Sequence, residues 1–175
     1  MTMLTRVVGV WRLDPLVFED VERDPRAGWQ AGLVVVASSL AAGVGLGGLP
    51  SAPRSVVTTS VAALLAWVAW ALVVYVIGVK LMPTAATRSN WGELARTTGF
   101  ATAPGLFRVA FALPVPPAVV FALVSAWMLA AMIIAVRQAL DYTSALRAFV
   151  VCLVGWLLST ALVMAWGFVA GTTVF

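Results

Sequence analysis

One arginine, Arg108, stands inside a long apolar segment, residues 99–117, between Phe107 and Val109. An ionisable side chain inside a membrane span is costly, and by default it indicates a functional site with a partner. Every Asp and Glu of the chain lies outside the expected spans or at the end of one, on the side expected to be cytoplasmic. The chemistry open to Arg108 is therefore hydrogen bonding to phosphates, to freed backbone carbonyls or to a partner molecule.

Two roles for Arg108 stay open. Six residues of helix, about 9 Å, separate it from Pro114, so its stem can nearly reach the outer surface and keep the guanidinium solvated. The alternative is a dedicated lipid or partner site beside Pro104. We expect Pro104 to kink its helix, because proline lacks the N–H of an α-helical hydrogen bond.

Catalysis is not expected. The chain has no histidine, a single lysine (Lys80) and a single cysteine (Cys152). A proton relay, a hydrolase triad or a metal site needs several such groups that converge, and one cysteine excludes an internal disulfide. We therefore expect a protein that is not an enzyme and that has no catalytic residue, no metal ligand and no cofactor.

The composition is that of a polytopic membrane protein. Hydrophobic residues make up 62% of the 175 residues and charged residues only 10%, with a mean hydropathy of +1.02. The apolar runs are about 15 to 25 residues long, the length of a bilayer crossing. The net charge of +4 reflects basic residues at the ends of these runs, so no nucleic-acid partner is expected. The mixed charges of residues 1–26 do not resemble a cleavable signal peptide.

We expect an all-α fold of five transmembrane helices preceded by a short interfacial helix. Asp24 with Pro25 predicts the start of the first span, and Asn90 with Glu93 predicts a capping box at the third. Prolines at 114, 116 and 117 leave only a tight turn before the fourth span, which predicts an antiparallel hairpin. The organisation is a cytoplasmic segment, 1–26, and a membrane domain, 27–175, with spans at about 27–49, 58–79, 91–113, 118–136 and 146–171.

The N-terminal segment mixes large apolar and acidic side chains. Asp14 can cap a short helix that begins at Pro15, and Leu16, Val17 and Phe18 can then lie in the headgroup zone. A disordered acidic leader is the alternative.

Charge places this segment in the cytoplasm. Nine of the 11 Lys and Arg residues fall in the N-terminal segment and in the second and fourth loops. The positive-inside rule then predicts a multi-pass protein of the inner (plasma) membrane with its N-terminus inside and its C-terminus outside.

Two further groups of residues are candidate contacts. Arg137, Asp141 and Arg147 surround the fourth loop, where they can form a local ion pair or contact lipid and partner proteins. Gly167 and Gly171 form a small-x-x-x-small pattern that favours close helix packing.

Several stretches together resemble the bacterial branch of the YIP1 family, five-span membrane proteins related to the eukaryotic Yip1/Yif1 trafficking factors. The matching stretches are LDPLVFEDVERDP (13–25), YVIG (75–78), WGELARTTGFATAP (91–104), WML (127–129), AVRQALDYTS (135–144) and RA (147–148). The resemblance implies a cytoplasmic N-terminus, five helices and no catalytic centre.

The function expected from this reading is to organise membranes or partner membrane proteins. One alternative is an accessory subunit of a larger membrane complex, and another is a small transporter or lipid-handling protein. The expected partners are membrane lipids and other integral membrane proteins or a second copy of this chain.

Overall fold

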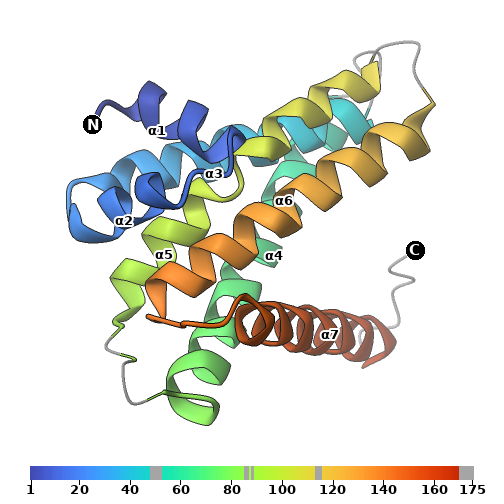
Figure 1. Ribbon diagram of the computed structural model, residues 1–175. Helices are drawn as coiled ribbons and strands as arrows, with labels where there is room; N and C mark the ends of the chain where they lie inside the picture. The colour runs from blue at the N-terminus through green and yellow to red at the C-terminus, as the bar shows by residue number, and fades with distance from the viewer. Residues whose placement is uncertain (48–52, 85–86, 88, 113–115, 170–175) are drawn as a thin grey trace.

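The computed structural model is a bundle of helices, and it describes residues 1–47, 53–84, 87, 89–112 and 116–169 (Figure 1). No strand occurs within these ranges. The all-α prediction is confirmed. The elements are α1 (Met3–Trp11), α2 (Pro15–Arg23), α3 (Ala27–Gly47), α4 (Pro53–Tyr75), η1 (Val76–Leu81), α5 (Trp91–Phe100), η2 (Ala103–Ala112), α6 (Pro117–Ala139) and α7 (Ala145–Val169).

Three stretches within the described residues are long and apolar enough to cross a membrane, namely Ala27–Val44, Val56–Leu81 and Ala118–Ala139. A shorter apolar helix covers Ala145–Leu158. The chain is therefore a multi-pass membrane protein, while the number of five crossings stays a prediction.

The N-terminal segment folds into two helices that pack against the bundle. Asp14 accepts a hydrogen bond from the Leu16 backbone N–H at 3.0 Å and caps α2, as predicted. The expectation that the apolar residues of α2 lie in the headgroup zone is wrong for Val17 and Phe18, which are 2% and 0% exposed. They are buried because α5 and α6 offer α2 an apolar surface, and only Leu16 faces outward.

The second apolar helix is longer than its sequence predicts at both ends. It begins at Pro53 rather than near 58, since proline is tolerated in the first turn of a helix. It also continues past Gly78 as the π-helix η1. The Tyr142 hydroxyl donates to the carbonyl oxygens of Gly78, at 3.2 Å, and Met82, at 2.8 Å, which stabilises this wider turn.

The third predicted span is divided in two. The capping box of Asn90 and Glu93 begins α5, with both reciprocal hydrogen bonds at 3.0 Å. The kink expected near Pro104 is a complete break, because α5 ends at Phe100 and the chain resumes as the 3₁₀-helix η2. The Thr102 hydroxyl donates to the Gly99 carbonyl at 2.7 Å across this break.

The remaining helices follow the predicted order. α6 runs back beside α5 and η2, which is the expected antiparallel hairpin (Figure 1). α7 then packs against α4 and α6. The helix ends thus alternate: the start of α5, the end of α6 and the start of α7 lie at one end of the bundle, and the end of η2 and the start of α6 lie at the other (Figure 1).

Candidate functional site

Two cavities between the helices meet at Arg108. The first, here the polar cavity, has a volume of about 230 Å³ and lies between α3, α4, η2 and α6. The second, here the apolar cavity, has a volume of about 530 Å³ and lies between α4, η2, α6 and α7. Four residues line both cavities: Trp70, Arg108, Met128 and Met132.

The winding of η2 directs Arg108 toward these cavities. In a 3₁₀-helix residues three apart lie above one another, so Gly105 and Arg108 share a face. That face approaches the bundle closely, because a Cβ atom on Gly105 would collide with the Ser38 hydroxyl of α3 and come within 3.2 Å of the Met128 sulfur. Pro104, at the start of η2, is buried. The break in the third span therefore aims Arg108 at the cavities.

An aromatic cluster holds the adjacent face of η2. The Phe107 ring stacks on Trp127 of α6 with centroids 5.3 Å apart and contacts Trp11 of α1 at 5.1 Å. The Trp127 indole N–H donates to the Trp11 carbonyl at 3.1 Å. These contacts fix the position of η2 beside Arg108.

The polar cavity has a largely apolar wall that carries several hydrogen-bonding side chains. Ser38, which is 4% exposed, and Ser39 contribute hydroxyls, whereas the Thr102 hydroxyl already donates its hydrogen to the Gly99 carbonyl. The indole N–H of Trp67 is buried and has no hydrogen-bond partner. Among the described residues no group forms a hydrogen bond or an ion pair with the Arg108 guanidinium, and no carboxylate lines either cavity. The cavities can therefore bind a group through these donors.

Arg137, Asp141 and Arg147 lie away from these cavities, at the α6–α7 connection. The predicted ion pair does not form among the described residues. Arg137 Nε donates to the Tyr142 carbonyl at 3.3 Å, and the Arg147 guanidinium lies 5.7 Å from the Tyr142 ring centre. Asp141 adopts a left-handed conformation, with φ of 51°, that ends α6 and removes the helical i,i+4 geometry the pair requires.

The glycine pair of α7 stays a prediction. Gly167 lies within α7, but its contacts and the whole of Gly171 lie outside what the structure describes.

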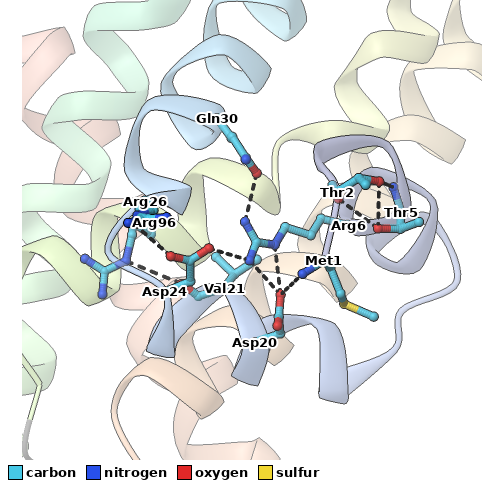
Figure 2. A network of polar contacts seen from close by, with 10 residues as sticks. All are labelled: Met1, Thr2, Thr5, Arg6, Asp20, Val21, Asp24, Arg26, Gln30 and Arg96. Atoms are coloured by element: carbon cyan, nitrogen blue, oxygen red, sulfur yellow. Dashed lines mark hydrogen bonds and ion pairs between the residues drawn. The ribbon is translucent and has the colours of Figure 1, made fainter.

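A buried arginine that the sequence analysis missed joins the N-terminal helices to the bundle. Arg6 of α1 is 1% exposed. Its guanidinium donates to the Asp20 carboxylate at 2.8 Å, to the Asp24 carboxylate at 2.7 Å and to the Gln30 amide oxygen at 2.8 Å (Figure 2). Two features of the sequence could have indicated this network: Arg6 is the single arginine of the apolar stretch 3–11, and Asp20 and Asp24 are spaced four residues apart, as on one face of a helix.

These contacts set the charge states of the network. Burial disfavours the charge on Arg6, but hydrogen bonds to Asp24 and Asp20 outweigh burial and raise the pKa of the guanidinium. The hydrogen bonds from Arg6 and from the Arg26 backbone N–H hold the pKa of the Asp24 carboxyl below its usual value. Both groups stay charged in the folded chain.

A second arginine, Arg96 of α5, caps the end of α2. It donates to the Glu22 carbonyl at 2.6 Å and to the Val21 carbonyl at 3.4 Å. The side chain of Glu22 is only partly exposed. Burial, followed by the negative charges of Asp141 and Glu93, raises the pKa of its carboxyl to about 7.

Apolar helices of membrane-spanning length, packed around cavities that carry hydrogen-bond donors, define a multi-pass membrane protein with a candidate binding site. The Yip1 domain family matches residues 8–167, which extend from α1 into α7. The chain belongs to this family. Comparisons with curated proteins and with solved structures find no match.

Proposed function

We propose that this chain is a non-enzymatic membrane protein that organises partner membrane proteins in the cell inner membrane. Its contact face consists of α1, α2 and the start of α3. The observation that carries the proposal is the Arg6 network, which joins α1, α2 and the start of α3 into one unit. A surface that is ordered before binding loses less conformational entropy when a partner docks.

The exposed residues of this unit support a docking role. Leu4 of α1 is 71% exposed, Leu16 of α2 is 70% exposed and Trp29 of α3 is 63% exposed. Large apolar side chains on an ordered surface favour contact with a protein or a membrane. The arrangement of the helix ends and the distribution of Lys and Arg support a cytoplasmic location for this face.

Site-specific photo-crosslinking in native membranes tests this proposal. A photoreactive residue replaces Leu16 on the contact face or, as the matched control, Leu65 of α4, which is 62% exposed on an apolar span. After mild-detergent extraction, mass spectrometry should find a reproducible adduct with one membrane protein, or with a second copy of this chain, from position 16 and not from position 65.

The outcomes separate the alternatives. An adduct from position 65 alone would favour an accessory subunit bound along its spans. Recovery of the isolated chain from both positions would contradict the organising role.

A further inference from the structure

The apolar cavity has the size and lining of a ligand site. Its volume of about 530 Å³ lies within the range of small-molecule sites, roughly 300 to 1,000 Å³. Phe149, Cys152 and Leu153 of α7 and Leu129 of α6 line it. Phe121 and Trp156, which also line it, are both 58% exposed on apolar helices. A hydrocarbon chain can therefore enter it sideways from the bilayer.

The adjoining polar cavity requires a hydrogen-bond acceptor. A guanidinium carries five N–H donors and binds phosphate in a bidentate manner. The buried Trp67 N–H is a second donor without a partner, and such groups are rare in folded proteins. The side chains of Arg108 and Trp67 both line the polar cavity. A bound group that satisfies them must carry several acceptor oxygens and, to balance Arg108, a negative charge.

We propose that the two cavities together bind one anionic membrane lipid. Its phosphate contacts Arg108 and Trp67 in the polar cavity, and one acyl chain fills the apolar cavity. Arg108 lies where the two cavities meet, which matches the junction between headgroup and chain in an amphiphile. This inference goes beyond the organising function and does not depend on it.

The alternative occupants fit less well. A free phosphate would leave the larger, apolar cavity unfilled. A transmembrane helix of a partner protein would need a carboxylate at membrane depth to pair with Arg108, and such residues are costly and rare. An anionic lipid brings the charge and the hydrocarbon together at no such cost.

Lipid retention by charge variants tests the site. The purified chain is placed in nanodiscs of equal parts phosphatidylglycerol and phosphatidylcholine, and native mass spectrometry measures which lipid it retains. We expect preferential retention of phosphatidylglycerol, weakened about tenfold by Arg108→Gln, as when a hydrogen bond to a charged group is lost. Arg108→Lys keeps the charge without the bidentate geometry and should be intermediate.

The control is Arg12→Gln, which removes an exposed positive charge from the end of α1 and should leave retention unchanged. Trp67→Phe keeps an aromatic ring but removes the donor, and it should weaken retention severalfold. Equal lipid selectivity in Arg108→Gln and Arg12→Gln would overturn the proposal. Displacement of the lipid by inorganic phosphate would show a free-anion site instead and would also overturn it.

A second measurement uses the unmodified chain and decides the proposal even if Arg108→Gln does not fold. Phosphatidylglycerol with a photoreactive acyl chain should label residues of the apolar cavity, such as Phe149 and Cys152. Unlabelled phosphatidylglycerol should compete, and phosphatidylcholine should not. Labelling confined to outward-facing residues such as Leu65 and Leu123, without competition, would contradict the lipid site.

Discussion

Arg6 and Asp24 are 18 residues apart in sequence, but the Arg6 guanidinium donates to the Asp24 carboxylate at 2.7 Å. The bond connects the first helix to the turn that leads into the first apolar span. Since Asp20 and Gln30 accept from the same guanidinium, α1, α2 and α3 share one polar centre (Figure 2). The N-terminal helices are therefore an integral part of the bundle.

Removal of this guanidinium should destabilise the fold. Arg6→Met leaves two carboxylates without their partner, and breaking a buried charge pair in this way should cost about 3 kcal/mol. Chemical unfolding in mild-detergent micelles measures the change. Arg12→Met is the control, because Arg12 is exposed and its substitution should cost at most about 0.5 kcal/mol. Equal losses in the two variants would show that the network contributes nothing.

Glu22 should make stability depend on pH near neutrality. Its folded pKa of about 7 lies above the ordinary value of 4.5, so the folded chain binds the proton more tightly than the unfolded chain. The stabilisation from this group is present below pH 4.5 and is lost as the pH rises through about 7.

Comparison with Glu22→Gln isolates this effect. Above neutral pH the variant should be the more stable by about 1 kcal/mol, allowing for solvent screening, and the difference should vanish in acid. Stability against pH is measured for both chains. Asp141→Asn removes a neighbouring charge and should move the midpoint to lower pH. If the stability of the wild type and that of Glu22→Gln changed with pH in the same way, the raised pKa of Glu22 would be refuted.

The Tyr142 hydroxyl should stabilise the π-helical end of the second span. Tyr142→Phe leaves the carbonyls of Gly78 and Met82 without this donor, which should cost about 1–2 kcal/mol. Hydrogen exchange should increase at residues 76–82. Tyr75→Phe is a matched control, because within the described part of the chain the Tyr75 hydroxyl forms no hydrogen bond. Similar exchange in both variants would argue against the role of Tyr142.

Gly105 should tolerate no side chain. Gly105→Ala places a methyl group against the Ser38 hydroxyl, and such overpacking should cost about 1–3 kcal/mol. Gly32→Ala in α3 meets nothing within 4 Å and should stabilise the helix by about 0.5–1 kcal/mol. Thermal unfolding followed by tryptophan fluorescence compares them. Because η2 positions Arg108, Gly105→Ala should also reduce phosphatidylglycerol retention, and unchanged retention would contradict that link.

Local signals predicted much of the fold. Asp14, Asn90 and Glu93 cap helices as expected, because a capping side chain bonds to a backbone N–H two or three residues away. Local rules erred at Pro53 and Gly78, where the sequence alone does not show that a proline sits in a first turn or that Tyr142 stabilises a π-helix. The predicted ion pair of Asp141 failed because its backbone conformation ends the helix.

Composition by itself determined the class of the protein, because its apolar runs are long enough to cross a bilayer. These runs form helices, since a bilayer offers no hydrogen-bond partners and a helix pairs the backbone N–H and C=O groups internally. The sequence also identified Arg108 as exceptional. Only the tertiary structure decided which residues surround Arg108. Only the tertiary structure showed that Arg6 is buried between the N-terminal helices. Both depend on contacts between residues far apart in the chain, which no local pattern encodes.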